Sequence, residues 1–114
     1  MSDTELFSII TVVKDDPEGF AVSLNSLEEQ THRNFEVVVV DSSNDPSAIN
    51  QMLEDSGLNG DIPMHYQWCT PSGIYPAMNL GLDNATGEFA YFLNAGDRLH
   101  APDILVKVAQ KLGN

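Results

Sequence analysis

The sequence predicts a single α/β domain of three layers, with helices on both faces of a mostly parallel sheet. Short apolar segments rich in β-branched and aromatic residues alternate with segments whose apolar residues recur at helical spacing. This alternation is typical of parallel strands joined by right-handed helical crossovers. The chain has 114 residues, which fits one domain with one hydrophobic core. We therefore expect residues 1–114 to form a single domain.

Four segments are predicted to be strands. Residues 7–13 are apolar and β-branched, and residues 35–40 contain four consecutive valines, the pattern of a strand buried on both faces. Residues 64–69 form a weaker third strand, and residues 89–93 form a fourth. The usual order for such a sheet is 3-2-1-4, numbered along the chain, so we expect residues 89–93 to lie at one edge.

Four helices are predicted to follow the strands. Asp16 and Asp45 are each followed by proline, which combines an N-cap side chain with proline at the first helical position. Pro102 is expected to open the last helix. The apolar residues expected to face the sheet recur every three or four positions: Phe20, Leu24 and Leu27; Ile49, Met52 and Leu53; Ile74, Ala77, Met78, Leu82 and Ala85; and Leu105, Val108 and Leu112.

The composition excludes several classes of function. There are 17 acidic and 5 basic side chains, a net charge of −12 that argues against binding to nucleic acid or to an anionic membrane. The only cysteine is Cys69, so neither an intramolecular disulfide nor a cysteine-based zinc cluster is expected. The N-terminal residues are acidic, unlike a signal peptide, and no apolar stretch approaches the ~20 residues needed to span a bilayer. We therefore expect a cytoplasmic protein.

Polar residues come directly after three of the predicted strands, at their carboxyl ends: Lys14, Asp15 and Asp16; Asp41, Ser42, Ser43 and Asn44; and residues 94–97, which read Asn-Ala-Gly-Asp. Ligands of open α/β sheets bind at this edge, so we expect the three clusters to meet and to place three carboxylates around one crevice. Mg²⁺ or Mn²⁺ would suit such a site, because each takes one or two carboxylates and completes its shell with water and substrate phosphates. The cation would neutralise a departing diphosphate.

Simpler explanations exist for several of these side chains. Asp16 is better explained as a helix cap than as a metal ligand, and Asp41 and Asp97 could each be a turn or cap residue. Lys14 and Arg98 are better explained as solvated side chains than as phosphate ligands.

Five segments together resemble the start of a family 2 glycosyltransferase of the GT-A fold, which is Rossmann-like. They are residues 7–13, 25–31, 34–42, 73–79 and 85–97. The resemblance extends from residue 7 to about residue 105. It implies an enzyme that uses Mg²⁺ or Mn²⁺ to bind a nucleoside-diphosphate sugar, with a UDP-sugar favoured, and transfers the sugar with inversion to an acceptor hydroxyl.

The resemblance also implies roles for residues of the donor site. Thr11 and Val13 lie where the family receives the nucleobase, and Asp41 matches the aspartate that binds the base or ribose. Asn79 lies in the helix that carries a short Arg-Asn or Met-Asn signature near the diphosphate. Val13 stands where the family often has an aromatic residue, which predicts weaker binding of uridine.

Asn94 and Asp97 match the Asp-x-Asp-like motif of the family, whose last aspartate holds the metal. The motif often carries two or three acids, whereas this chain has one carboxylate here, so the cation is expected to be held less firmly. The second half of the family supplies the acceptor site and the general base. No residue here matches that base, and we expect negligible transfer by the 114-residue chain alone.

Two alternatives to an enzyme compete with this interpretation. A receiver-like signalling domain would also be acidic and α/β, but its phosphorylated aspartate follows the third strand, whereas Asp41 follows the second. A non-catalytic relative kept for oligomerisation is the other alternative. The edge strand at residues 89–93 has neither the lysine nor the proline that discourages pairing, which predicts a homodimer built on this strand.

Overall fold

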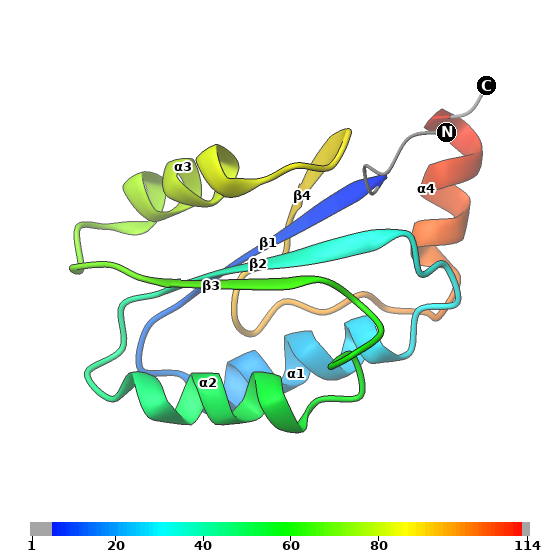
Figure 1. Cartoon of the computed structure of the whole chain (residues 1–114). Coiled ribbons are helices and arrows are strands. Elements are labelled where there is room, and N and C mark those ends of the chain that lie inside the picture. Colours follow the sequence, from blue (N-terminus) through cyan, green and yellow to red (C-terminus); the bar gives the residue numbers. More distant parts are fainter. Residues whose placement is uncertain (1–5, 113–114) are drawn as a thin grey trace.

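The computed structural model describes residues 6–112 and consists of strands and helices in strict alternation (Figure 1). The elements are β1 (Phe7–Val13), α1 (Pro17–Glu28), β2 (Phe35–Asp41), α2 (Pro46–Asp55), β3 (Met64–Trp68), α3 (Ile74–Asn84), β4 (Phe89–Phe92) and α4 (Ile104–Leu112). All eight predicted elements are confirmed. The strand β2 extends one residue further than predicted, and β3 and β4 each end one residue earlier.

The four strands form one parallel sheet in the order β3-β2-β1-β4, as predicted. Phe7 is in register with both Phe35 and Phe89, so the three strands begin at the same level. A receiver-like domain places its first strand between the second and third strands, whereas β1 here lies between β2 and β4. The topology therefore differs from that of a receiver.

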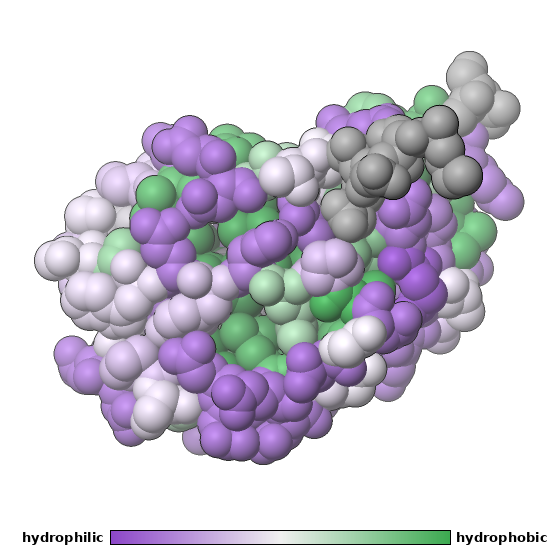
Figure 2. Space-filling model, viewed as in Figure 1, coloured by the Kyte–Doolittle hydropathy of each residue, from purple (hydrophilic) through white to green (hydrophobic). Residues whose placement is uncertain are grey.

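Helices cover both faces of the sheet, which confirms the three-layer prediction. The helices α1 and α2 pack on one face, α3 lies on the other, and α4 lies near the start of β1 (Figure 1). The main core contains alternate residues of β1 and β2 together with side chains of α1, α2 and α4: Phe7, Ile9, Val13, Phe35, Val37, Val39, Phe20, Leu24, Leu27, Ile49, Leu53 and Leu105. Hydrophobic residues are visible between α2 and α3, whereas the outer side of α2 is hydrophilic (Figure 2).

The apolar stripe predicted for α3 was partly wrong. Only Ala77 and Gly81 are buried in this helix, while Ile74 and Leu82 are 49% and 42% exposed. The helix packs closely on the sheet through its small residues, because a Cβ atom at Gly81 would lie 2.4 Å from Cγ2 of Ile10. Ile74 and Leu82 are consequently turned outward, while Met78 is half-buried.

The inward stripe predicted for α4 also needs correction. Leu105 is fully buried and Val108 packs partly against the core, but Leu112 is 43% exposed. The helix begins at Ile104, two residues after Pro102. Leu112 is its last residue and lies beyond the part of α4 that contacts the core.

The predicted N-caps of α1 and α2 are confirmed. The Asp16 carboxylate accepts a hydrogen bond from the backbone N–H of Gly19 at 3.0 Å, and the Asp45 carboxylate accepts one from Ser47 N–H at 3.1 Å. Each satisfies a backbone donor that the first turn of a helix leaves unpaired. None of the helices in residues 6–112 is long and apolar enough to cross a membrane.

Candidate functional site

A cleft of about 320 Å³ opens at the edge of the sheet where the strands end (left side of Figure 1). It is lined by the ends of β1, β2 and β4 and by the segment that leads into α3: Val12, Val13, Lys14, Asp16, Ser42, Pro71, Ser72, Gly73, Ile74, Ala77, Asn94 and Ala95. The three polar strand ends therefore meet, as the sequence predicted. Val13 and Asn94 are the predicted site residues that line this cleft.

Hydrogen bonds fasten the loop after β1 to the loop after β2. Ser42 N–H donates to the carbonyl of Val13 at 3.0 Å, and Asp15 N–H donates to Ser43 Oγ at 2.9 Å. The Asp15 carboxylate accepts a bond from Asn44 N–H at 2.8 Å, with Asp15 itself in the left-handed region at φ 51°. These bonds hold the ends of β1 and β2 together beside the cleft.

The carboxylate of Asp41 is turned away from the cleft. Asp41 has no exposed surface, and its two oxygens accept hydrogen bonds from Tyr66 Oη at 2.6 Å and from Ser43 N–H at 2.9 Å. Burial, followed by the hydrogen bond and charge of Asp41, raises the pKa of Tyr66 well above its usual value of 10.0, so the phenol keeps its proton. Ser42, the next residue, lines the cleft instead, and Thr11 is also buried, at 1% exposure.

The segment from Asn94 to Asp97 forms a tight turn after β4. Asp97 N–H donates to the Asn94 carbonyl at 2.8 Å, and Asn94 N–H donates to Asp97 Oδ2 at 3.2 Å. The side-chain oxygen of Asn94 accepts a bond from Val12 N–H at 3.2 Å, which joins the turn to β1. Gly96 has a φ of 97°, a conformation that favours glycine. The Ser23 hydroxyl lies within hydrogen-bonding distance of the Asn94 and Asp97 carbonyls and ties the turn to α1.

The predicted convergence of three carboxylates was wrong. Within residues 6–112 no three histidine, cysteine, aspartate or glutamate side chains gather in a way that could hold a metal ion. Of the predicted acids only Asp16 lines the cleft, and it caps α1, while Asp41 is buried and Asp97 faces a neighbouring hollow. Asp97 uses Oδ2 for its hydrogen bond within the turn, which leaves Oδ1 available. The residues therefore fit a cation that takes one carboxylate and completes its shell with phosphate and water.

The segment between β3 and α3 also contributes to the site, although the sequence pattern did not predict it. Residues 71–74 and Ala77 form one wall of the cleft. Gly73, at φ 101°, is the N-cap of α3 and provides no side-chain cap, so the N–H groups of Ile74 and Tyr75 at the start of the helix have no side-chain acceptor; Pro76 has no N–H. The rule that ligands bind beyond the carboxyl ends of parallel strands applies to β3 as well. The segment after β3 was not included in the predicted site because the strand pattern of residues 64–69 is weak. Asn79 lies further along α3, is exposed and does not line the cleft.

The charge distribution of the cleft suits an anion. Lys14 lines it, although the chain as a whole carries only five lysines and arginines against 17 acids. The N-terminus of α3 adds the positive end of a helix dipole, a common binding element for phosphate. Asp16 is the one carboxylate in the lining, and its hydrogen bond to the α1 backbone partly offsets its charge.

Comparison with known proteins gives concordant results. The family model described as Glycosyl transferase family 2 matches residues 8–114. A PGL/p-HBAD biosynthesis glycosyltransferase of Mycobacterium tuberculosis is 35% identical over 109 residues, covering 95% of this chain and 42% of the relative. The amylovoran biosynthesis glycosyltransferase AmsB of Erwinia amylovora is 33% identical over 101 residues, covering 82% of this chain and 32% of the relative. The chain thus spans less than half the length of these curated relatives.

Two solved structures share the fold. The mannosyltransferase PcManGT from Pyrobaculum calidifontis, in complex with GDP-Man and Mn²⁺, superposes with a TM-score of 0.83 and 27% identity, covering 99% of this chain and 34% of that one. Residues 1–349 of TarS from S. aureus, in complex with UDP-GlcNAc, give a TM-score of 0.82 and 26% identity, covering 95% and 31%.

Proposed function

The chain belongs to glycosyl transferase family 2, and we propose that its cleft binds the nucleoside-diphosphate sugar that serves as the sugar donor. The observation that carries this proposal is the meeting of Lys14, Asn94 and the uncapped N-terminus of α3 in one cleft at the carboxyl edge of the sheet. Two structural neighbours are described as complexes with GDP-Man and with UDP-GlcNAc, which supports a donor of this class.

Within the cleft, the diphosphate would lie against the N-terminus of α3 and Lys14, which supply the positive potential. The nucleoside would lie toward Val13 and Ser42. Asp41 would contribute indirectly, because its hydrogen bond to Ser43 N–H holds the loop that presents Ser42.

We also infer that a divalent cation, Mg²⁺ or Mn²⁺, is held at the turn from Asn94 to Asp97, with Asn94 on the side of the cleft and Asp97 on the side of the neighbouring hollow. A neighbour described as a complex with Mn²⁺ supports this inference. When bound, the cation supplies charge neutralisation for the diphosphate leaving group. The chain's own contribution is to fix the turn: Ser23 donates to the Asn94 and Asp97 carbonyls, and Asn94 N–H donates to Asp97 Oδ2, which orients the Asp97 carboxylate.

We propose that the whole protein transfers the sugar with inversion to an acceptor hydroxyl. An inverting transfer requires a base that deprotonates the acceptor hydroxyl as the diphosphate departs. Asp16 is engaged as a helix cap and Asp41 is buried, so neither is placed to act as that base.

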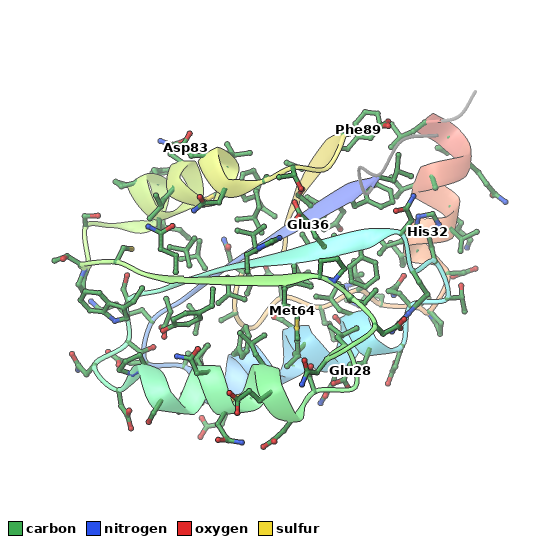
Figure 3. The ribbon with its side chains drawn as sticks, in the orientation of Figure 1. Glu28, His32, Glu36, Met64, Asp83 and Phe89 are labelled. Carbon is green, nitrogen blue, oxygen red and sulfur yellow. The ribbon has the colours of Figure 1, made fainter. Side chains whose placement is uncertain are left out.

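Replacing Asp97 by asparagine is expected to weaken the binding of UDP or GDP in the presence of Mn²⁺ by about tenfold or more, and to abolish the dependence on the metal. The substitution removes the one carboxylate charge of the turn but keeps an oxygen that can accept the bond from Asn94 N–H. Isothermal titration calorimetry with and without Mn²⁺ measures both effects. The matched control is Asp83→Asn, which removes a carboxylate on the outer side of α3 (Figure 3) and should leave affinity unchanged. Tight binding without metal that neither variant alters would rule out the proposed site.

A second proposal concerns association through β4. This edge strand begins with Phe89, which is 40% exposed and points away from the sheet (Figure 3), and its outer backbone groups have no strand partner among the described residues. We infer that two copies pair along this edge. Tyr91→Lys is expected to shift the protein to monomer in light scattering, whereas Val22→Lys, at a 43% exposed position on α1, is expected to have no effect. A monomeric unmodified protein at high micromolar concentration would contradict the inference.

A further inference from the structure

Asp15, which lies between β1 and α1, has a backbone conformation that side chains rarely adopt. Its φ is 51°, and within residues 6–112 it is the one residue other than glycine with a positive φ. The left-handed region is costly for most residues and more accessible to aspartate and asparagine. Such a conformation persists only where surrounding contacts enforce it, and it is often found beside functional sites.

Three hydrogen bonds hold Asp15 in this conformation, all with the loop after β2. Its N–H donates to Ser43 Oγ at 2.9 Å. Its carboxylate accepts bonds from the backbone N–H of Asn44 at 2.8 Å and from the Asn44 side-chain amide at 3.5 Å. Because φ sets the direction of the N–H relative to the side chain, the two sets of bonds together favour the left-handed conformation.

Ser43 is a rigid partner for Asp15. It is buried, and its other polar groups are also engaged: the N–H donates to Asp41 at 2.9 Å, and the carbonyl accepts a bond from Trp68 Nε1 at 3.0 Å. The position of Ser43 is therefore set by β2 and β3. Asp15 is bonded to a part of the molecule that is fixed independently of it.

The conformation of Asp15 separates the charges of its loop. Lys14 and Asp16 line the donor cleft, whereas Asp15 lines a different hollow, of about 290 Å³, at the start of α2. The Asp15 carboxylate is thereby kept out of the space proposed for the diphosphate, which it would repel. Lys14 is the one basic residue among the described residues that line the cleft, and it is left to face that space.

We propose that Asp15 is a positioning residue for donor binding: its left-handed conformation, held by Ser43 and Asn44, directs Lys14 toward the diphosphate. The inference rests on the proposed function, because it explains how a residue of the donor cleft is oriented. Asp15 does not itself touch the donor, so its effect passes through Lys14. Replacing Asp15 should therefore weaken the binding of an anion, although a purely electrostatic effect of removing a negative charge would have the opposite sign.

The test is isothermal titration calorimetry of the chain with UDP and with pyrophosphate, each in the presence of Mg²⁺. Asp15→Ala is expected to weaken the binding of both ligands by about tenfold, because alanine removes the acceptor for Asn44 N–H and disfavours positive φ. Asp15→Asn removes the same charge but keeps a side-chain oxygen for that bond and tolerates positive φ, so both affinities should stay within about twofold of the unmodified chain. Asp83→Ala, on the outer side of α3, should leave both unchanged.

A double-mutant cycle separates positioning from a general structural effect. Lys14→Gln removes the charge proposed to bind the diphosphate and is expected to weaken binding about tenfold. Because Asp15 acts through Lys14, adding Asp15→Ala to Lys14→Gln should weaken binding no further.

Ser43→Ala tests the same link, and it decides the question if Asp15→Ala does not fold. It removes only the Oγ that accepts the Asp15 N–H and leaves the carboxylate in place. It should weaken the binding of both ligands about threefold when Lys14 is present and should have no effect in the Lys14→Gln background.

The inference is overturned if Asp15→Ala and Ser43→Ala bind as tightly as the unmodified chain, if Asp15→Asn is as weak as Asp15→Ala, or if the losses add to that of Lys14→Gln. It is also overturned if the binding of UDP is weakened and that of pyrophosphate is not, since Asp15 would then act on the nucleoside through the loop that presents Ser42. Failure of the proposed function is seen separately, because the unmodified chain would then bind neither ligand, and both proposals would fall.

Discussion

Replacing Glu36 by alanine is expected to lower the free energy of unfolding by about 3–5 kcal/mol, a large part of the stability of a domain of this size. Glu36 is 1% exposed and lies on the α3 side of the sheet (Figure 3). Its carboxylate accepts hydrogen bonds from Ser8 Oγ at 2.5 Å, Thr86 N–H at 2.7 Å and Thr86 Oγ1 at 3.0 Å, and His65 Nε2 lies 3.0 Å away. Ser8 in turn accepts a bond from Gly87 N–H at 2.7 Å.

The size of this effect depends on the segments that the carboxylate connects. Glu36 joins β1, β2 and β3 to the segment between α3 and β4, and truncation would leave three donors without their acceptor. It would also leave a cavity beside buried strands. Urea denaturation measures the loss, and Glu54→Ala, on the exposed side of α2, is the matched control that should change stability by less than about 0.5 kcal/mol.

The pH dependence of stability gives an independent check on Glu36. Burial alone would raise the pKa of this carboxyl, but the hydrogen bonds from Ser8 and Thr86 and the charge of His65 outweigh it, so the pKa lies below its ordinary value of 4.5. The stabilisation is therefore fully present above pH 4.5 and is lost as the pH falls through the lower pKa of the folded state. Glu36→Gln should abolish this acid-dependent part, so the difference between the two proteins should shrink at low pH. A difference that is constant with pH would show that the carboxylate charge does not stabilise the fold.

Most of the fold could be predicted because each element carries a local signal. The four valines of β2 and the Asp-Pro pairs that begin α1 and α2 indicate structure within a few residues, and the alternation of strands and helices restricts the topology. The inward face of α3 could not be predicted in the same way. Gly81 has no side chain to mark it as a core residue, and its burial depends on Ile10, which is distant in the sequence.

The site was predictable to the level of segments and less so to the level of side chains. The rule that ligands bind at strand ends located the loops after β1, β2 and β4 correctly. The rule did not indicate which of Asp41 and Ser42 lines the cleft. The alternation of side chains along a strand does indicate it. Asp41 is on the same face as Val39, toward the core, and Ser42 lines the cleft. Asp97 lies outside the cleft because the backbone reverses at Gly96, which no side-chain pattern reveals.

Gly81→Ala is expected to destabilise the protein by about 1–3 kcal/mol through overpacking, even though alanine in place of glycine favours an exposed helix by about 1 kcal/mol. The new methyl group would lie 2.4 Å from Cγ2 of Ile10 and 3.5 Å from Cγ2 of Val40, and both neighbours are buried β-branched residues with little freedom to move. Asp83→Ala, on the outer side of the same helix, is the control and should change stability by less than about 0.5 kcal/mol.

A double-mutant cycle identifies the contact responsible. Ile10→Ala removes the Cγ2 atom and should by itself cost about 2–5 kcal/mol, because it leaves a cavity under α3. Combined with Gly81→Ala, the total loss of stability should be smaller than the sum of the two single losses by about 1–2 kcal/mol. The reason is that the methyl group added at Gly81 would partly fill the cavity left by Ile10→Ala. Strict additivity, or a stabilising Gly81→Ala, would mean that α3 is not held against β1 at this point. The packing matters for the cleft as well, because the same helix carries the wall formed by Gly73, Ile74 and Ala77.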